Sequence, residues 1–571
     1  MRFIGKILLT FALLLVLAIV LVYVLLQTRW AAGWVSRWIS NNSEYRVSVE
    51  KLDHNWSSPG RVTLNNVVFG QKNQPEILSA GEVDLDLSWR QITEPRFFDR
   101  VVLINGRLNV SPSSMNLPLQ ANTLQLSKMA LTGNAAGLDI QGQQINAGIS
   151  PWQPKPHQLL GDKADFQLSA ASLTVNGLPA ENVLIQGNIN HKNLTLSNFG
   201  GDLARGQLTG KATQAADGSW NIENLRLSNV RLQTSKPLSA FFDDFQTLPK
   251  VTLQRLDLID ARLQGTDWAF SDVDLSVQDL TLEKGDWQSD DGEITLNATD
   301  MIDGNLHIQD PIISLDLSPQ GIAIKQATAR WERSLLRTTG NWLRANKRLQ
   351  LDEVSVAGLE YTLPENWKQL WNQALPDSLS EVFISRFIAN RNLIIDINPQ
   401  FPFQLTALDG LGNNLLLARN HQWGIWNGTL NLNASEATFN RNDVRRPSIT
   451  LNANDSQVNI SELSAFTKEG LLEASATVDQ QPQRHFSLKM TGRSVPANQL
   501  ENWGWQHLAL EGNANMQLNL QGQMPANVDY TPTLSGTLQV NSASGQSVTE
   551  RMVNGLVSGA ATTAAPVPAT P

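Results

Sequence analysis

At 571 residues the chain is too long for one compact core, so we expect several domains or one elongated repeat. The formal net charge of −9 and the absence of a long basic run argue against nucleic acid as a partner. The chain contains no cysteine, which excludes disulfides, thiolate metal sites and cysteine nucleophiles, and which fits an oxidising compartment.

The chain begins with a long apolar segment. From Ile7 to Leu26 the run is unbroken, and only Thr10 and Tyr23 carry a polar atom. A helix of this length spans about 30 Å, the thickness of a bilayer core. The alternative is a cleaved signal peptide, but its apolar part is about 7–15 residues long and ends at a small-residue cleavage site. No good site closes this run, so we predict an uncleaved transmembrane anchor at 7–26.

Charge around this segment predicts its orientation. Arg2 and Lys6 precede it, and no acidic residue appears before Glu44. Positively charged flanks tend to stay in the cytoplasm. We therefore expect residues 1–6 to be cytoplasmic and the chain from Arg29 onward to be delivered across the membrane.

The segment 27–43 is predicted to form an amphipathic helix. A helical projection places Trp30, Trp34 and Trp38 on one side, and Ser36 and Arg37 on the other. Tryptophan prefers the membrane–water boundary, where its ring is buried and its N–H stays hydrated. The pattern is equally consistent with tryptophans that pack into the first protein layer, and both interpretations stay open.

Between residues 44 and 548 the dominant pattern is alternation with a period of two. Leucines at 85 and 87 alternate with Asp84 and Asp86, and the same holds around Asp257 and Asp274. This alternation is typical of antiparallel strands with one apolar and one polar face. The residues that we expect to line the apolar face are Leu85, Leu87, Leu256, Leu258, Val273 and Leu275.

Glycine-containing pairs predict the turns between these strands: Asn176-Gly177, Gly200-Gly201, Asp217-Gly218 and Asp291-Gly292. No linker interrupts the alternation, whereas a small sandwich would close after about 100 residues. We therefore favour a mainly β fold, in which a long antiparallel sheet bends lengthwise over its apolar face, over a string of small domains.

Helices are expected to be few and short after the N-terminal region. The candidates are residues 363–375, 237–248 and 495–503, of which the first carries Pro364 in its first turn and an apolar stripe. The C-terminal part, 549–571, is predicted to contain a short helix and then a disordered tail, because its last residues are rich in Ala, Thr and Pro.

Signatures of catalysis and of metal binding are missing. The seven histidines lie far apart in the sequence, so no H-E-x-x-H spacing occurs. The segment from Gly206 to Lys211 is one residue short of a phosphate-binding loop, and Ala212 stands where such a loop needs Ser or Thr. We predict no catalytic residue, no metal site, no cofactor and no enzymatic activity.

Four stretches near the start of the chain resemble AsmA-like proteins: Tyr45–Val49 (YRVSV), Gly60–Val67 (GRVTLNNV), Ile77–Leu87 (ILSAGEVDLDL) and Val101–Val110 (VVLINGRLNV). Two glycine-bearing segments, Phe199–Gly210 and Gly424–Leu430, are also similar to this family. These are soft patterns rather than catalytic signatures, and they extend over nearly the whole chain.

The resemblance implies a protein of the Gram-negative inner membrane with its bulk in the periplasm. It further implies an elongated β-sheet groove with a hydrophobic interior, similar to bridge-like lipid transfer proteins. Phospholipid is then the expected ligand, the inner membrane a partner, and outer-membrane lipid homeostasis the process served. A periplasmic or outer-membrane protein partner is also compatible with the family.

Two functional hypotheses follow from these patterns. In the first, acyl chains lie against the apolar face, where each buried methylene contributes about 0.8 kcal/mol. In the second, the protein's own side chains fill that face and partner proteins dock on strand edges, as in a scaffold or assembly factor. An enzyme is the third and least supported possibility.

Overall fold

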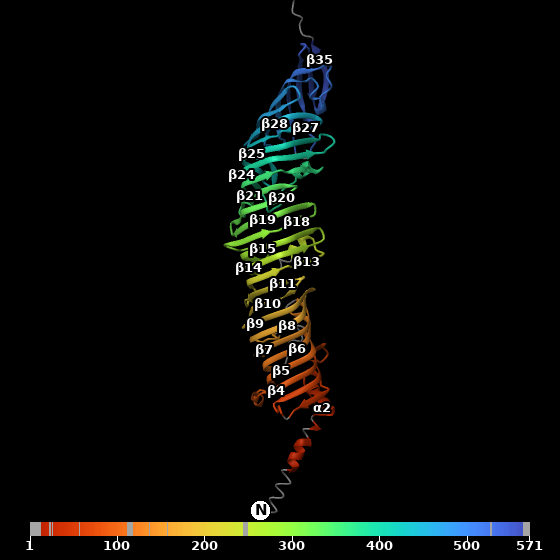
Figure 1. Ribbon diagram of the computed structural model, residues 1–571, viewed down its shortest axis with the longest axis vertical. Coiled ribbons are helices and arrows are strands. Elements are labelled where there is room, and N and C mark those ends of the chain that lie inside the picture. Colours follow the sequence, from red (N-terminus) through yellow and green to blue (C-terminus); the bar gives the residue numbers. More distant parts are fainter. Residues whose placement is uncertain are drawn as a thin grey trace, which may run out of the picture. The chain divides into compact units, whose positions relative to one another are not determined.

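The computed structural model describes residues 13–21, 24–25, 27–55, 57–110, 118–135, 138–156, 158–243, 249–525 and 528–563. The chain divides into two units, and the strand-rich region expected at 44–548 is shared between them. Unit 1 comprises residues 1–266 and 272–286, and unit 2 comprises 267–271 and 287–571. The chain passes from one to the other within β15 and β16 (Figure 1).

Unit 1 begins with one helix and continues almost entirely in strands. Its elements are α2 (Arg29–Asn42), β1 (Tyr45–Ser48), β2 (Lys51–His54), β3 (Arg61–Gln71), β4 (Glu76–Leu87), the 3₁₀ turn η1 (Trp89–Ile92), β5 (Phe97–Val110), β6 (Gln120–Ala135), β7 (Leu138–Ser150), β8 (Lys163–Val175), β9 (Leu178–Asn190), β10 (Asn193–Leu203), β11 (Gly206–Gln214), β12 (Trp220–Ser228), β13 (Arg231–Gln233), α3 (Leu238–Asp243), β14 (Val251–Gln264), β15 (Trp268–Glu283) and β16 (Asp286–Trp287).

Unit 2 has the same strand-rich character. Its elements are β17 (Gly292–Asn297), β18 (Asp300–Asp303), β19 (Leu306–Ser318), β20 (Gly321–Trp331), β21 (Ser334–Leu343), β22 (Arg348–Ala357), β23 (Glu360–Thr362), α4 (Trp367–Trp371), β24 (Glu381–Asp396), β25 (Phe403–Arg419), β26 (Gln422–Asn433), β27 (Glu436–Phe439), β28 (Asn442–Ala453), β29 (Gln457–Phe466), β30 (Leu471–Asp479), β31 (His485–Pro496), η3 (Glu501–Trp503), β32 (Asn513–Gln523), η4 (Thr531–Thr533), β33 (Ser535–Ser542), β34 (Ser547–Val553) and β35 (Leu556–Thr563).

Most neighbouring strands form antiparallel hairpins, as the alternation predicts. The pair Asn176-Gly177 makes the two-residue turn between β8 and β9, with positive φ at both positions (48° and 81°). Asp217-Gly218 likewise lies between β11 and β12. The turn predicted at Gly200-Gly201 is wrong, because both glycines lie inside β10. A Cβ on Gly200 would approach the Leu208 carbonyl oxygen to 2.8 Å, so close backbone packing explains this glycine.

Five parallel pairings, found at three places among the described residues, depart from the predicted antiparallel sheet. Strand β5 pairs in parallel with β6, β12 and β13 with β14, and β22 and β23 with β24. A parallel neighbour requires the chain to return to the edge from which the previous strand began. The returning connections follow β5, β13 and β23, and the last two contain the short helices α3 and α4.

Many strands contain a residue with positive φ near the middle. Asn66, Asn105, Asp260 and Asn414 lie within strands and have φ near +50°. Asn and Asp tolerate this left-handed conformation better than other residues with a Cβ. A residue in this conformation interrupts the extended backbone and bends the strand there. Single residues therefore determine where these strands bend, although the surrounding sequence alternates regularly.

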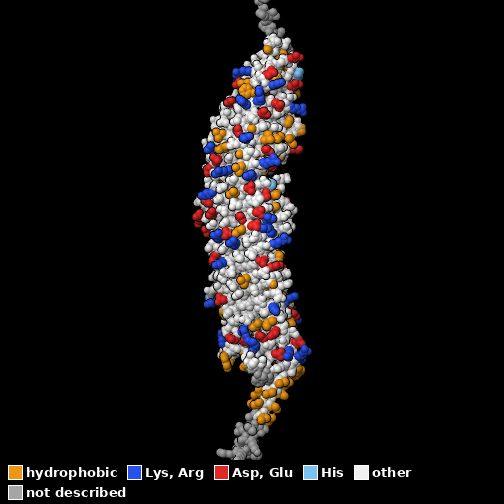
Figure 2. Space-filling model, viewed as in Figure 1, with side chains coloured by type: hydrophobic (Ala, Val, Ile, Leu, Met, Phe, Trp, Pro, Cys, Tyr) orange, Lys and Arg blue, Asp and Glu red, His pale blue; other side chains and the backbone are white. Residues whose placement is uncertain are grey.

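The two faces of the predicted strands are those expected from the alternation. On β4, the carboxylate of Asp84 accepts from the Thr63 hydroxyl at 2.6 Å, and Asp86 pairs with Arg61 at 2.7 Å. Leu85 instead packs against the apolar core of unit 1. Figure 2 shows charged side chains of both signs scattered over the visible faces of both units.

The apolar side chains gather in separate cores. The core of unit 1 joins β3 to β9 and includes Ala121, Met129 and Ile145, which are at most 2% exposed. The largest core cluster of unit 2 lies between strands β30 to β34 and the segment 497–512. That segment inserts Leu500, Trp505 and other side chains over the strands, so the protein itself covers this part of the apolar face.

Several helix predictions need correction. The helix expected at 363–375 is confined to Trp367–Trp371, and that expected at 237–248 is described only at Leu238–Asp243. Residues 495–503 are instead the end of β31 and the turn η3, because Val495 is fully buried opposite Ala514. The short helix predicted after 549 is wrong: β34 and β35 form a hairpin through Asn554-Gly555. The tail from 564 lies outside the described residues.

The predicted anchor falls partly outside the described residues. Residues 1–6, Ile7 and Leu26 are not described, whereas 13–21 and 24–25 are helical. Their large apolar side chains are 42–65% exposed. Within the described part of the chain, no helix has the length and apolarity needed to cross a membrane.

Candidate functional site

Unit 1 contains an apolar cavity of about 350 Å³. Strands β5 to β9 supply most of its lining, and the loop between β7 and β8 adds Leu159 and Leu160. Trp152 holds this loop, because its indole N–H donates to the Leu159 carbonyl at 3.1 Å. Gln167 is the one polar side chain among the lining residues. Such a space offers a ligand hydrophobic contact and almost no hydrogen bonding.

Unit 2 contains a second cavity of about 730 Å³. Phe403, Leu405 and Leu432 form part of its apolar wall, while Asp396 and Lys368 give it a polar margin. Both volumes lie in the range of about 300–1,000 Å³ that is usual for small-molecule sites. This combination of an apolar wall and a few charged groups suits an amphipathic ligand.

The crossover segment 363–380 borders the second cavity. It leaves β23 at one edge of the sheet and rejoins β24 at the other, since β22 and β24 are parallel. Trp367 of this segment lines the cavity, and its indole N–H donates to the Asp396 carboxylate at 3.0 Å. At the far edge, Trp371 stacks on Trp423 with ring centroids 5.9 Å apart. The segment therefore crosses the apolar face and is fixed at both ends.

The segment 497–512 borders the same cavity from another side. Trp503 lines the cavity, and its indole N–H donates to the Phe439 carbonyl at 3.1 Å. Asn442, in the next strand, donates to the Gln499 carbonyl at 2.7 Å. Together the two segments partly roof the apolar wall, so a ligand in this cavity would lie between strands and covering segments.

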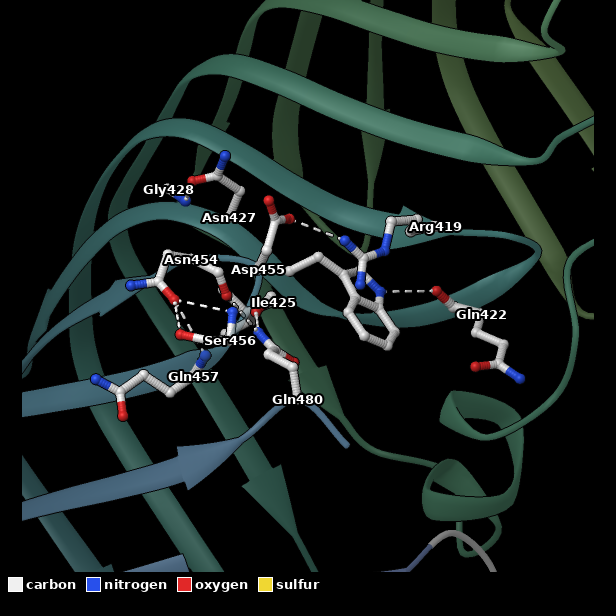
Figure 3. A network of polar contacts seen from close by, with 11 residues as sticks. Arg419, Gln422, Ile425, Asn427, Gly428, Asn454, Asp455, Ser456, Gln457 and Gln480 are labelled. Carbon is white, nitrogen blue, oxygen red and sulfur yellow. Dashed lines mark hydrogen bonds and ion pairs between the residues drawn. The ribbon is translucent and has the colours of Figure 1, made fainter. Parts of the chain in front are cut away.

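A polar network occupies the edge of unit 2 around the β25–β26 turn (Figure 3). Arg419 pairs with Asp455 at 2.9 Å, and its guanidinium lies 4.4 Å from the centre of the Trp426 ring. Arg484 lies 5.2 Å from the same ring, and burial lowers the pKa of its guanidinium. Gln480 donates to the Ile425 carbonyl at 2.8 Å. These contacts join successive hairpins along one edge.

The six residues predicted to line the apolar face do not line either cavity. Leu85 packs against the unit 1 core, and Val273 is 4% exposed. Leu87, at the end of β4, is 45% exposed. Leu256, Leu258 and Leu275 are half-buried. The structure thus places these residues on or near the apolar face but brings them into no common site.

The residues that do line the cavities carried a usable sequence signal. Leu126 and Leu432 belong to alternating strands of the kind from which the six predictions were drawn. The alternation does not predict where a second segment covers the apolar face. That place depends on the crossover 363–380 and on loops such as 151–162.

The three tryptophans of α2 are exposed rather than packed into the protein. Trp30, Trp34 and Trp38 are 71%, 56% and 58% exposed. The opposite side of the helix carries Ala32 and Ser36, and the Ser36 hydroxyl accepts from the Val49 N–H at 3.0 Å. Small residues thus attach the helix to the first strands and leave the indoles outside.

No constellation suited to metal binding occurs among the residues that the structure describes. Many of the ion pairs of the described residues join neighbouring positions of the sheet, as Arg61 and Arg100 do with Asp86. These two guanidinium groups lower the pKa of Asp86, chiefly through the Arg61 hydrogen bond. Contacts of this kind hold strands together and give no chemistry of their own.

Comparison with known proteins agrees with the resemblance seen in the sequence. A model of the AsmA family matches residues 404–565, which include most of the second cavity's lining. The chain is 50% identical over 568 residues to the AsmA family protein YicH of Escherichia coli (strain K12). The alignment covers 99% of this chain and 100% of that protein.

Proposed function

The chain belongs to the AsmA family, and from this premise we propose that it binds phospholipid by holding acyl chains in its apolar cavities. The unit 2 cavity is the single feature on which the proposal rests. It has an apolar wall, a volume of about 730 Å³ and charged groups at its margin. An acyl chain gains about 0.8 kcal/mol for each methylene removed from water, and no directional bond hinders sliding.

We further propose that the protein is anchored in the inner membrane by residues 7–26 and that its bulk lies in the periplasm. The apolar run and its preceding positive charges support this orientation. The exposed indoles of α2 would then lie in the interface that follows the anchor. In this setting the protein would serve outer-membrane lipid homeostasis by binding or conducting lipid, without catalysis, metal or cofactor.

Site-specific photo-crosslinking in cells tests the lipid proposal. A photoreactive residue at Leu432, which faces the unit 2 cavity, should capture phospholipid. The matched control is Asn431, the preceding residue of the same strand, which is exposed. Equal lipid capture at both positions, or protein capture alone at 432, would count against a lipid-filled cavity.

A second function, a non-conducting scaffold for the assembly of outer-membrane proteins, is favoured by one observation. Between β30 and β34 the apolar face is filled by the protein's own segment 497–512, with Leu508 and Leu510 at most 4% exposed. A continuous conduit needs an open face along its length. A crosslinker at Leu432 that captures one specific protein instead of lipid would support the scaffold.

A further inference from the structure

The turn between β4 and β5 exposes two large apolar side chains. Trp89 is 90% exposed and Ile92 is 79% exposed. Single exposed apolar residues are common, but tryptophan is highly buried on average. In a 3₁₀ turn, side chains three positions apart eclipse one another, so Trp89 and Ile92 lie on the same side of η1. They form a small apolar patch directed away from the protein.

The rest of the turn is held firmly. The Ser88 hydroxyl accepts from the Arg90 N–H at 3.2 Å. The Arg90 guanidinium lies 3.9 Å from the centre of the buried Phe97 ring and donates to both carboxylate oxygens of Glu94 at 3.0 Å. These contacts fix the backbone of η1 while leaving its apolar pair outside. The exposure of that pair is therefore a property of a well-ordered turn.

The position of η1 relates it to the N-terminal segment. The Gln27 side chain, just before α2, donates to the His54 carbonyl at 3.0 Å. His54 ends β2, and the Leu87 N–H at the end of β4 donates to the Gly60 carbonyl in the turn after β2. The start of α2 and η1 thus share one edge of unit 1, about 10–15 Å apart at the usual strand spacing.

The figures show both elements at one end of unit 1. In Figure 1 the short orange-red turn beside β4 and the helix α2 lie on two sides of the same end of unit 1, the end from which the helical residues 13–21 extend. Figure 2 shows hydrophobic side chains gathered over that helical extension and α2. The exposed Trp30 belongs to the first turn of α2, close to the shared edge.

We propose that η1 is a second membrane contact, whose Trp89 and Ile92 insert into the surface of the bilayer that holds the N-terminal segment. This inference rests on the proposed anchor. Tryptophan is favoured at the membrane–water boundary, and isoleucine gains from the acyl region below it. With the indoles of α2, η1 would support the end of unit 1 on the bilayer at two separate places. The edge between them would then face the lipid surface.

The experiment uses the natural absence of cysteine. Single cysteines at Ile92, Leu17 and Glu223 are labelled with an environment-sensitive fluorophore, and the full chain is reconstituted into phosphatidylethanolamine–phosphatidylglycerol vesicles with or without spin-labelled quencher lipid. Glu223 is an exposed residue of β12, well away from η1. We expect strong quenching at 17 and 92 and none at 223.

The three positions separate the two proposals. Quenching at 17 but not at 92 overturns the η1 contact and leaves the anchor intact. Quenching at 92 but not at 17 retains the contact and overturns the anchor, and quenching at neither overturns both. Equal quenching at 92 and 223 would also overturn the contact, since it would show general proximity to lipid.

A variant pair tests the same contact without a label. Trp89→Ser combined with Ile92→Ser should leave the melting temperature unchanged, because both side chains are exposed. In the parent, we expect vesicles to protect the β4–β5 turn from protease and detergent to leave it open to cleavage. The double variant should be cleaved at this turn equally fast in vesicles and in detergent. The double variant Leu178→Ser with Leu306→Ser, at other exposed apolar positions, is the control. Protection of the turn by a soluble protein instead of by vesicles would overturn the proposal in favour of a protein partner.

Discussion

The indole N–H of Trp367 donates to Oδ2 of Asp396 at 3.0 Å, which joins the crossover segment 363–380 to β24 beside the unit 2 cavity. Asp396 is only 4% exposed, and its Oδ1 accepts from the Asn398 N–H at 2.9 Å. A buried carboxylate that loses a donor is costly. This bond therefore holds the crossover segment against the apolar face.

Replacement of Trp367 by Phe should loosen the crossover segment. The change keeps an aromatic ring but removes the N–H, so Asp396 loses one of its two donors. We expect the free energy of unfolding to fall by about 1–3 kcal/mol, measured by chemical denaturation. Limited proteolysis should also cleave 363–380 faster. Trp371→Phe is the control, because its ring stacks on Trp423; similar effects of both changes would show that the hydrogen bond has no special role.

The strands and their faces were predictable because a strand with one exposed and one buried face shows alternating polar and apolar residues in its own sequence. Asp84 and Asp86 bond to side chains on the polar face, and Leu85 between them packs into the core. The sequence carries no such pattern for whether two neighbouring strands run parallel or antiparallel. Val101 of β5 and Leu124 of β6 pair in parallel, yet their alternation would read the same in an antiparallel pair. The antiparallel assumption failed wherever the chain crosses back.

The cavities were less predictable than the strands. Leu432 and Leu258 have the same alternating surroundings, but Leu432 lies where covering segments enclose a space, whereas Leu258 lines neither of the two cavities described above. The C-terminal hairpin was missed for another reason. Its turn, Asn554-Gly555, is a strong hairpin signal, and Val548, Glu550 and Met552 alternate as buried positions of β34. Because one of these buried positions is a glutamate, the sequence of β34 does not show a regular apolar face.

Neutralising Asp86 should destabilise unit 1 at neutral pH. Arg61 and Arg100 bond to its carboxylate at 2.7 and 2.8 Å and lower its pKa. The stabilisation is present above the ordinary pKa of an aspartate and is lost as the pH falls through the lowered folded value. We expect Asp86→Asn to cost about 1 kcal/mol at pH 7, since both pairs are partly exposed. The difference from the parent should vanish in acid.

Urea unfolding across a pH series measures this effect. Glu76→Gln is the control, because its pair with Arg46 is more exposed on both sides and should contribute less. A constant difference between Asp86→Asn and the parent from neutral to strongly acidic pH would show that packing, and not charge, is responsible.

Two substitutions to aspartate should distinguish an open apolar face from a sealed core. Val273 is 4% exposed, so Val273→Asp buries an unpaired charge and should cost about 3–5 kcal/mol. Leu258 is half-buried on the neighbouring strand, so Leu258→Asp should be milder because water can reach the carboxylate. Equal losses of stability in denaturation experiments would show that the face is sealed at 258.

Photo-crosslinking at 258 and 257 extends the same test to ligand binding. The Asp257 carboxylate accepts from Arg255 at 2.8 Å and from Ser276 at 3.1 Å, which places it on the polar face. If lipid also lies along the apolar face of β14, a photoreactive residue at 258 should capture phospholipid in cells, and one at 257 should not. Capture of protein alone at 258 would favour the scaffold for this segment.

Glu550 is a buried acid in the core of unit 2. It is 1% exposed and pairs with Leu538 across β33 and β34, between Val548 and Met552 of the core cluster. Its Oε2 has no hydrogen-bond partner among the described residues, although the Gln506 backbone bonds to the carboxyl group. Burial raises its pKa, because the charged form is poorly solvated there. The folded protein therefore holds the Glu550 proton up to a higher pH than the unfolded chain does.

Replacing Glu550 by Gln should stabilise unit 2 at neutral pH by about 1 kcal/mol, because the side chain keeps its volume and loses its charge. In the parent, the folded state binds this proton more tightly than the unfolded state does. Stability is thus complete below the ordinary pKa of a glutamate and falls as the pH rises through the raised folded value. Urea unfolding between about pH 4 and pH 8 should show this fall in the parent and a flatter profile in Glu550→Gln. Glu473→Gln, at an exposed pair with Arg493, should keep the parent's slope. If Glu550→Gln instead destabilises the protein at every pH, the carboxylate must be ionised and bound by a group that Gln does not satisfy.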